Sequence, residues 1–303
     1  MIITIDDENV SKRLDKVVSE MFPDISRSFI KKMIEEGEIT VNDKKVKAGY
    51  SLKKNDELSV VIKEPEEVNI LPEDIDLDII YEDDDIIVIN KPKDMVVHPA
   101  PGHYSHTLVN ALMFHCKDSL SGINGELRPG IVHRIDKDTT GVLVACKNDN
   151  AHKALSEQLK VHSITRKYYA ICYGSLKEDG TIETTIGRSL NDRKKMAVNV
   201  KGGREAITHY KVLDNLNNRF TYVECQLETG RTHQIRVSMA SIGHPILGDE
   251  VYGPKKNTLN VNLQGQVLHA GVLGFIHPRT NEYMEFTAPL PEYFNNLLQR
   301  LKK

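Results

Sequence analysis

A polar segment between two apolar runs, residues 133–141, carries side chains that could perform chemistry. Its sequence, HRIDKDTTG, combines an imidazole, a guanidinium, carboxylates and hydroxyls within a few positions. Loops held in place by rigid strands are common positions for catalytic groups. Read by itself, the segment is as compatible with a solvated connector as with a catalytic loop, and both interpretations stay open.

A second cluster, residues 227–237, has the sequence LETGRTHQIRV. Gly230 suits a tight turn, and Thr232 is placed to cap a following helix. Arg231 and Arg236 are candidates to bind a phosphate or a carboxylate, and a bidentate contact would hold Asp136 ionised and oriented. The alternative is that both are ordinary surface arginines.

A third feature, residues 165–170, has the sequence TRKYYA on a predicted strand. An aromatic ring beside basic residues suits base stacking together with phosphate contact. A strand tyrosine is more often a core residue, so this pattern alone indicates little.

Metal and nucleotide motifs are absent from the sequence. The chain has 12 histidines, but none lies in an H-E-x-x-H motif or in a Cys/His cluster. The glycine-rich dinucleotide motif, the P-loop and G-x-S-x-G are also missing. The sequence therefore predicts no metal and no cofactor. A metal-dependent hydrolase remains an alternative, with the candidate ligands His133, Asp136, Asp138 and His233.

The charge of the chain is unevenly distributed. Of its 303 residues, 40% are hydrophobic and 27% charged, values typical of a globular protein with a buried core. The formal net charge of −3 gives no support to a nucleic-acid partner. Acidic residues are concentrated between Glu64 and Asp85, however, and no Lys or Arg occurs from Glu64 to Asn90. The remainder is more basic than the total indicates, and distribution decides binding.

The cysteines and the N-terminus bear on location. The 4 cysteines are widely spaced, unlike those of disulfide scaffolds or structural zinc sites. The first residues do not resemble a signal peptide, and no apolar run approaches transmembrane length. We expect a reduced, cytoplasmic protein without a membrane role.

These candidate residues must be positioned by two domains. Residues 1–63 read as a small module, in which a helix carries Leu14 and Val18 and a second helix runs from Ser26, as N-cap, to Gly37, as C-cap. The strands expected in this module are 39–42 and 58–62. The acidic, proline-containing segment 64–76 is the predicted linker, and residues 77–303 form the larger domain.

Strands dominate the larger domain. The pattern predicts strands at 86–89, 142–145, 168–172, 207–213 and 220–227, and helices at 151–159, capped by Asn150, and at 235–242. From residue 267 onward the pattern alternates strand and turn. Because regular β-α-β alternation is missing, we expect an α+β fold with a mixed, mainly antiparallel sheet flanked by helices.

Taken together, these motifs resemble the RluA/RluD-type pseudouridine synthases. Residues 133–141 resemble the family signature H-R-L-D-x-x-T-S-G, and residues 166–170 resemble its R-x-Y-x-A strand. Further blocks also fit in order, at 81–83, 87–92, 97–99, 229–237, 243–249, 268–270 and 288–291, so the resemblance covers most of the chain. Thr140 stands where the family usually has Ser, and Ser238 where it often has His.

The first module resembles the alpha-L RNA-binding domain of a small-subunit ribosomal protein and of tyrosyl-tRNA synthetases. Residues 13–15, 26–27, 34–37 and 41–42 carry that resemblance. Basic side chains of such a module would face RNA phosphates. The candidates are Lys12, Arg13, Arg27, Lys31 and Lys32.

The resemblance implies an isomerisation of uridine to pseudouridine, without a cofactor. It assigns Asp136 as nucleophile or initiating base, Tyr168 to the flipped base and the carbon-5 proton, and Arg236 as the partner of Asp136. Arg134 would occupy the space left by the flipped nucleotide or hold the RNA backbone. Further RNA contacts are expected from His133, Thr139, Arg231, His233 and Gln234.

The resemblance also implies a partner and leaves alternatives. It points to 23S rRNA or a pre-50S particle as the substrate of a monomeric enzyme, while a tRNA target stays open. A non-catalytic RNA-binding or ribosome-assembly protein is the main alternative. The attacking step also stays open, since Asp136 could attack the anomeric carbon, attack the base, or remove a ribose proton to form a glycal.

Overall fold

The computed structural model divides the chain into two compact units, Met1–Glu67 and Val68–Lys303. Each unit is described by itself. The structure describes all residues except 24, 62–69, 101–102, 118, 126–127, 191, 193–194, 255–258, 260, 262 and 303.

The small unit packs two helices on a three-stranded antiparallel sheet of order β1-β3-β2. Its elements are β1 (Ile2–Thr4), α1 (Leu14–Met21), α2 (Arg27–Glu36), β2 (Ile39–Val41) and β3 (Glu57–Val60). The expected caps of α2 are confirmed: the Ser26 hydroxyl accepts a hydrogen bond from Phe29 N (3.3 Å), and Gly37 is left-handed with φ 83°. The apolar faces of both helices meet the sheet in one core that includes Leu14, Val18 and Ile30.

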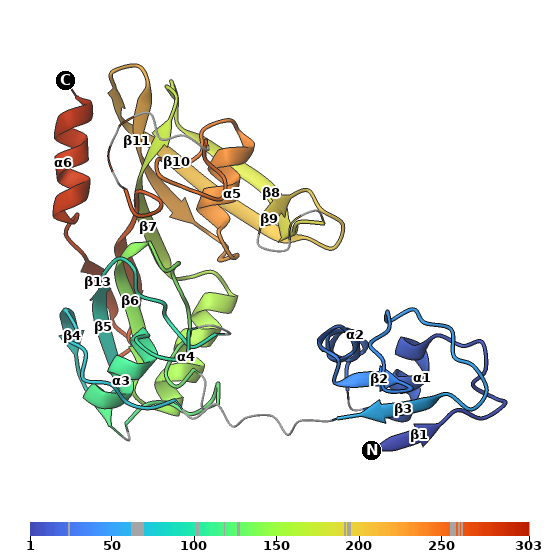
Figure 1. The fold of residues 1–303 in the computed structure, drawn as a ribbon. Coiled ribbons are helices and arrows are strands. Elements are labelled where there is room, and N and C mark those ends of the chain that lie inside the picture. Colours follow the sequence, from blue (N-terminus) through green and yellow to red (C-terminus); the bar gives the residue numbers. More distant parts are fainter. Residues whose placement is uncertain are drawn as a thin grey trace. The chain divides into compact units, whose positions relative to one another are not determined.

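The large unit contains a ten-stranded sheet of order β4-β5-β6-β12-β7-β11-β10-β8-β9, with β13 paired to β12 (Figure 1). Among the described strands only β6 and β12 pair in parallel, so the expected α+β class with a mainly antiparallel sheet is confirmed. The elements are β4 (Ile79–Glu82), β5 (Ile86–Lys91), α3 (Leu108–Cys116), β6 (Thr140–Cys146), α4 (Asp149–Lys160), β7 (Thr165–Tyr173), β8 (Gly180–Arg188), β9 (Met196–Val198), β10 (Arg204–Leu216), β11 (Phe220–Leu227), α5 (Gln234–Ser241), β12 (Leu268–Ile276), β13 (Tyr283–Thr287) and α6 (Glu292–Leu301).

Strand β7 separates two cores by its alternating side chains. Ile171 packs in a cluster with Phe294 of α6. Tyr168 and Ala170 pack on the other face, in the main core with Ile235 of α5. Arg166 shares the face of Tyr168 by the same two-residue period, so this face of β7 carries both a guanidinium and a phenol.

Strand β6 is buried along its whole length, which explains why its sequence is apolar without alternation. It begins directly after the polar segment 133–139. Gly141 has φ 113°, and a Cβ there would lie 2.1 Å from Ala270 O of β12. Only glycine fits at this close approach, which aligns the start of β6 with β12.

Several expectations about individual elements are wrong. Asn148, not Asn150, caps α4, because its side chain accepts from Ala151 N (3.0 Å). Thr232 does not cap α5, which begins after a left-handed His233 with no side-chain cap. The region after residue 267 ends in helix α6. Helix α3, which was not predicted, is apolar around most of its circumference and so lacks a helical pattern.

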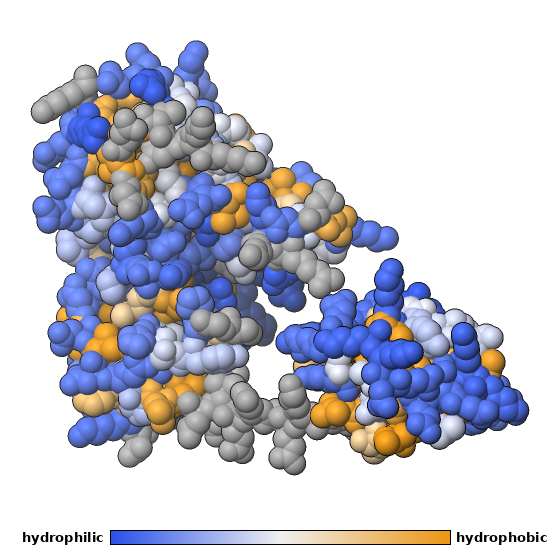
Figure 2. All heavy atoms as spheres, in the orientation of Figure 1, coloured by the Kyte–Doolittle hydropathy of each residue, from blue (hydrophilic) through white to orange (hydrophobic). Residues whose placement is uncertain are grey.

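The predicted linker, 64–76, lies partly outside the described residues. Of its described part, Ile70 is 6% exposed and packs in the core of the large unit, and the Glu73 carboxylate accepts from His106 N (3.0 Å). Hydrophilic side chains cover most of the visible face of each unit (Figure 2). No described helix is long and apolar enough to cross a membrane.

Candidate active site

Two cavities of the large unit meet at Asp136. The larger, of about 460 Å³, is lined by residues of the loop before β6, of β7 and of the start of α5. The smaller, of about 370 Å³, is lined in part by residues 96–98 and 134–138. Both cavities share Arg134, Ile135, Asp136, His233 and Arg236. Asp136 is therefore accessible from a cleft, although its side chain is only 18% exposed.

The Asp136 carboxylate is held by two residues of the α5 region. Its Oδ2 accepts a hydrogen bond from Arg236 Nη1 at 2.8 Å. Its Oδ1 lies 3.9 Å from His233 Nε2. A backbone bond from Thr139 N to Asp136 O (3.0 Å) closes the turn that carries the carboxylate. The pairing of Asp136 with Arg236 predicted from the sequence is present.

Arg236 bridges two carboxylates. Its Nε and Nη2 donate to Asp249 at 2.7 and 3.0 Å, so Asp249 takes one edge of the guanidinium and Asp136 the other. Burial, the largest influence, raises the pKa of Asp249, but Arg236 and backbone amides outweigh it and leave that pKa below its usual value. Burial likewise lowers the pKa of Arg236, and the two carboxylates more than reverse this. The guanidinium is thereby fixed as a charged, oriented group.

Tyr168 and His233 complete the wall beside Asp136. Tyr168 is 9% exposed, and burial is the main cause that raises the pKa of its phenol, with a smaller contribution from Asp136. The Tyr252 hydroxyl accepts from Met196 N (2.8 Å) and lies 2.9 Å from His233 Nδ1. If this hydroxyl donates to Nδ1, the Nε2 proton of a neutral His233 faces Asp136. Burial lowers the pKa of His233, which favours that neutral form.

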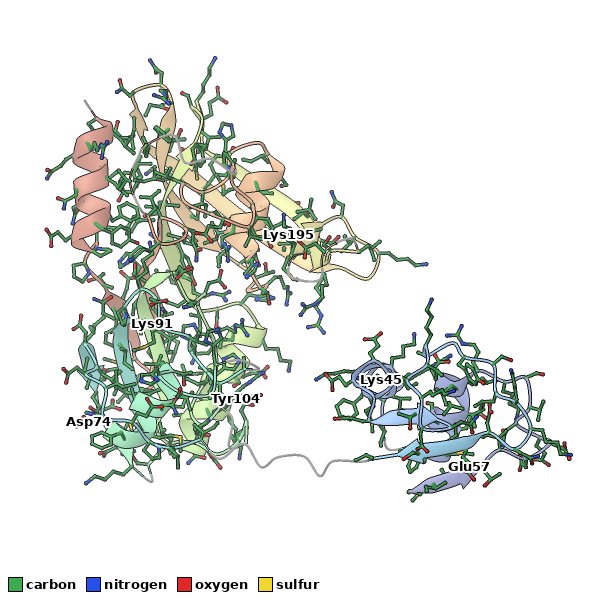
Figure 3. All side chains as sticks on the ribbon, viewed as in Figure 1. Lys45, Glu57, Asp74, Lys91, Tyr104 and Lys195 are labelled. Atoms are coloured by element: carbon green, nitrogen blue, oxygen red, sulfur yellow. The ribbon has the colours of Figure 1, made fainter. Side chains whose placement is uncertain are left out.

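Lys91 anchors the loop that carries Asp136. The residue is fully buried at the end of β5 (Figure 3). Its Nζ donates to Pro92 O (2.7 Å), Met95 O (2.9 Å) and Lys137 O (3.0 Å). Burial lowers the pKa of Lys91 to about 7. Since the third bond reaches the residue after Asp136, Lys91 fixes the backbone on which the carboxylate stands.

The remaining loop residues differ in what they can reach. Arg134 is exposed, lines both cavities, and makes no hydrogen bond or ion pair with the part of the chain that the structure describes. His133 accepts from Val144 N through Nε2 (3.1 Å), and burial together with Arg166 lowers the pKa of His133 to about 3. Thr139 is buried and accepts from Gln266 (3.0 Å). Of these three predicted RNA contacts, Arg134 alone has an exposed side chain.

The turn before α5 is organised by Gln234. Its buried amide accepts from Thr229 Oγ1 (2.8 Å) and Arg231 N (2.9 Å) and donates to Ile207 O (3.0 Å). Arg231 is half-buried and donates through Nε to Glu205 O (2.8 Å). Gln234 thus holds Gly230 and Arg231 at the edge of the larger cavity.

Two of the basic residues predicted to bind RNA in the small unit take part in an ion-pair cluster. Arg13 and Arg27 both donate to the carboxylate of Asp15, at 2.9 and 3.0 Å, and Asp15 is fully buried. Their own side chains remain 56% and 50% exposed. Lys12 donates to Asn9 (3.0 Å) and Lys32 lies 3.6 Å from Glu36. Lys31 is exposed.

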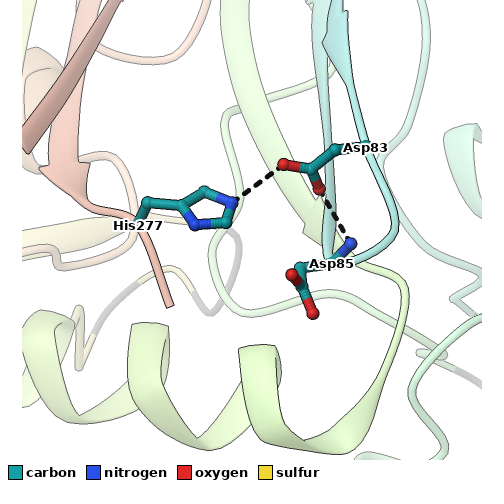
Figure 4. Close-up of side chains that lie close together, drawn as sticks. All are labelled: Asp83, Asp85 and His277. Carbon is teal, nitrogen blue, oxygen red and sulfur yellow. Dashed lines mark hydrogen bonds and ion pairs between the residues drawn. The ribbon is translucent and has the colours of Figure 1, made fainter. Parts of the chain in front are cut away.

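The residues proposed as ligands of a metal-dependent hydrolase do not converge. Within the described chain, the acidic and histidine side chains close enough to share a cation are Asp83, Asp85 and His277 (Figure 4). Their oxygens already have partners: Asp83 accepts from Tyr81 and His277, each at 2.9 Å, and Asp85 accepts from Asn148 (2.8 Å). This cluster is an ion-pair network that ties the β4–β5 turn to the end of β12.

Comparison with known proteins identifies the class to which this chain belongs. Residues 85–241 match the family described as RNA pseudouridylate synthase, and residues 12–58 match the S4 domain. The chain belongs to the RNA pseudouridylate synthase family. Within it, the chain is of the RluA type with an N-terminal S4 domain that binds RNA, as the resemblance predicted. The expected isomerase activity is confirmed, and the non-catalytic alternative is wrong.

Relatives match the chain over nearly its whole length. The "uncharacterized RNA pseudouridine synthase YlyB" of Bacillus subtilis is 52% identical over 99% of this chain and 98% of its own length. The "ribosomal large subunit pseudouridine synthase D" of Zymomonas mobilis is 43% identical over 99% of this chain and 96% of its own length. The protein of that name in Haemophilus influenzae is 42% identical over 97% and 93%.

Solved structures agree in fold. Human RNA pseudouridylate synthase domain containing 4 superposes with a TM-score of 0.57 at 26% identity, covering 74% of this chain and 92% of that chain. Human RNA pseudouridylate synthase domain containing 1 gives a TM-score of 0.56 at 24% identity, covering 79% and 98%.

Two supporting residues had no role in the sequence interpretation. Asp249 and Lys91 lie in motifs noted for the family resemblance, but nothing local predicts that Asp249 reaches Arg236 or that Lys91 reaches the Asp136 loop. The available signal was a lysine within an apolar strand, since a buried ammonium needs several acceptors.

Proposed function

We propose that this synthase modifies uridines of large-subunit ribosomal RNA and that Asp136 initiates the reaction. The observation that carries the role of Asp136 is its 2.8 Å bond to Arg236 inside a cationic cavity. Among the described residues lining the larger cavity, Asp136 is the only carboxylate. The cationic residues lining it are Arg134, Lys160, Arg166, Arg231 and Arg236. Such a cavity favours a polyanion and aims one carboxylate at it.

The reaction moves one bond. The bond between uracil N1 and ribose C1′ breaks, a bond between C5 and C1′ forms, the C5 proton leaves, and N1 gains a proton. Asp136 opens this sequence by attack on C1′, by attack on the base, or by removal of a ribose proton. Because Arg236 holds Oδ2, the other oxygen, Oδ1, is the one that faces the reacting nucleotide. Tyr168 packs against the detached base and assists transfer of the C5 proton.

Access to the uridine requires base flipping, which costs roughly a few kcal/mol. Arg134 is exposed and has no hydrogen-bond or ion-pair partner among the described residues, which supports its assignment to the space that the flipped nucleotide leaves. The RNA target is proposed from the relatives, some of which are named for the ribosomal large subunit. The S4 domain would deliver that RNA to the cleft.

The test is pseudouridine mapping across total RNA from a deletion strain complemented with wild-type protein, Asp136→Asn or Asp94→Asn. Asp136→Asn keeps the shape of the side chain but removes the reacting carboxylate, so conversion should fall at least ~10³-fold while RNA affinity changes little. Asp94 is an exposed aspartate paired with Lys137 and serves as the charge control.

The outcomes separate the parts of the proposal. Loss of one large-subunit site in the Asp136→Asn strain supports both target and residue. Loss of a tRNA site instead keeps Asp136 and replaces the target. Full conversion by Asp136→Asn would show that another group initiates the reaction, and Asp138→Asn would then be the next variant.

A further inference from the structure

Arg166 is a buried guanidinium without an acidic partner among the described residues. It is 6% exposed on β7, on the same strand face as Tyr168, and it lines the larger cavity. Its Nη2 donates to Glu228 O at 2.7 Å. Its Nε is enclosed and has no hydrogen-bond partner among the described residues. A carbonyl satisfies one donor but leaves the positive charge uncompensated.

The surroundings of Arg166 supply further positive charge. Burial is the main cause that lowers the pKa of Arg166, and the positive charge of Arg231 lowers it further. The carboxylate of Glu228, whose carbonyl Arg166 contacts, lies instead against His209 Nε2 at 2.6 Å. Burial and Arg166 lower the pKa of His133 to about 3, which favours the neutral form of that imidazole. A buried charge in such a place is costly unless an anion joins it.

The contrast with Arg236 is informative, because both guanidinia line the same cavity. Arg236 is neutralised by Asp136 and Asp249, whereas Arg166 has no carboxylate within ion-pair distance in the described chain. The backbone is also shaped around Arg166: a Cβ at Gly230 would lie 2.6 Å from Nη1. A Cβ at Gly230 would therefore displace the end of the Arg166 side chain, and the glycine leaves room for the guanidinium at this turn.

We propose that Arg166 and Arg231 form a subsite for the backbone phosphate of the nucleotide that enters the cavity. The proposal rests on the proposed function, since it takes a flipped uridine as the occupant. A planar guanidinium binds phosphate oxygens through paired N–H donors, and a second cation opposite it divides the phosphate charge. Arg236 orients the carboxylate that reacts, and Arg166 binds the phosphate of the nucleotide that carries C1′.

The test compares small probes that differ by one phosphate. Uridine, uridine 5′-monophosphate and uridine 3′-monophosphate are titrated against wild-type protein, Arg166→Gln, Arg166→Lys and Arg219→Gln at constant ionic strength. Arg219 is an exposed arginine on the turn before β11 and controls for the loss of one charge. In wild type and Arg219→Gln, one monophosphate should bind about 10-fold tighter than uridine.

Arg166→Gln should abolish that difference and leave the affinity for uridine unchanged, and Arg166→Lys should retain part of it. Equal binding of all three probes to wild type would overturn the proposal. An equal loss of uridine and monophosphate affinity in Arg166→Gln would also overturn it, since the residue would then contact the base or support the fold.

Kinetics on RNA supply a second criterion. A phosphate contact predicts that Arg166→Gln raises KM about 10-fold with kcat changed less than 3-fold. A fall in kcat at constant KM would mean that Arg166 acts on the detached base, which overturns the subsite. Asp136→Asn should keep the difference between monophosphate and uridine, so a failure of the proposed function would not imitate a failure of the subsite.

Discussion

Each unit contains a cluster of Arg–Asp ion pairs, but the ratio of guanidinium groups to carboxylates is reversed between the two clusters. In the small unit, one fully buried carboxylate, Asp15, serves two half-exposed guanidinia, those of Arg13 and Arg27. In the large unit, one buried guanidinium, Arg236, serves two carboxylates, those of Asp136 and Asp249. The first arrangement leaves an excess of positive charge at the surface. The second arrangement has one carboxylate more than it has guanidinium groups, and the other charged residues lining the larger cavity are basic.

We infer that this difference reflects two tasks: the small unit binds RNA, and the large unit carries out the reaction. Surface guanidinia can leave the ion pair partly and meet a phosphate, because they keep half of their area in water. In the proposed reaction the Asp136 carboxylate must act on one atom, which requires a fixed direction, and the buried Arg236 guanidinium provides it. Substitutions in the two ion-pair clusters test this interpretation, and their expected effects differ in size.

Arg236→Ala should have the largest effect, because it leaves two carboxylates beside each other without their cation. Removing one partner of a buried pair costs about 3–5 kcal/mol of folding stability. Single-turnover conversion should fall at least ~100-fold, because Asp136 loses its orientation. Chemical denaturation and single-turnover assays would measure the two effects. A loss confined to RNA affinity would show that Arg236 binds phosphate instead.

The two arrangements were unequally predictable from sequence. The contact between Asp136 and Arg236 is predictable because both residues lie in family motifs, although they are far apart in the chain. Asp249 was not assigned, since its place depends on the turn that lets its carboxylate accept from Val251 N and Tyr252 N as well as from Arg236. Folding decides such a three-way contact, and no residue pattern encodes it.

In the small unit the sequence found the basic residues but not their partner. Arg13 and Arg27 were expected to face phosphates, and the structure adds that both contact Asp15. The contact of Arg27 joins the start of α2 to the start of α1, a tertiary pairing that a helical period does not reveal. Strands β2 and β3 of this unit were predictable from sequence, because β-branched runs specify strands locally.

Asp15→Asn should destabilise the small unit by roughly 1–3 kcal/mol, because two guanidinia lose a buried acceptor charge. Hydrogen bonding by Arg13 is the main cause that lowers the pKa of Asp15 below 3.8. This stability is present above pH 3.8 and is lost as pH falls through the native pKa. Hydrogen exchange at Val17 and Val18 in the full chain would measure it, and the difference between wild type and variant should shrink below pH 3.8.

The control for Asp15→Asn is Asp7→Asn, which breaks the exposed pair with Lys54. Exposed ion pairs contribute about 0–1 kcal/mol, so this variant should exchange like wild type. Equal effects of the two variants would mean that the burial of Asp15 does not distinguish it from a surface aspartate.

Asp249→Asn should reduce single-turnover conversion about 10-fold with little change in RNA affinity. Asn keeps an oxygen for the amides of Val251 and Tyr252 but removes the charge that holds one edge of Arg236. The loss corresponds to roughly 1.4 kcal/mol in the barrier. A parallel titration of RNA would separate conversion from binding. An unchanged rate would show that Asp136 alone suffices to orient the guanidinium.

Arg27→Gln should have the smallest effect and should act only on binding. Asp15 keeps Arg13, so the fold is retained, while one exposed charge is lost. RNA affinity should fall about 3-fold, and the slope of log K against log salt should decrease by about one phosphate contact, or ~0.7–0.9. Arg300→Gln, on α6 of the large unit, controls for a charge outside both arrangements. The opposite result would be that Arg27→Gln changes the conversion rate of bound RNA but not the salt slope. The positive charge of the small unit would then act on the chemical step. The division between a small unit that binds RNA and a large unit that carries out the reaction would therefore be wrong.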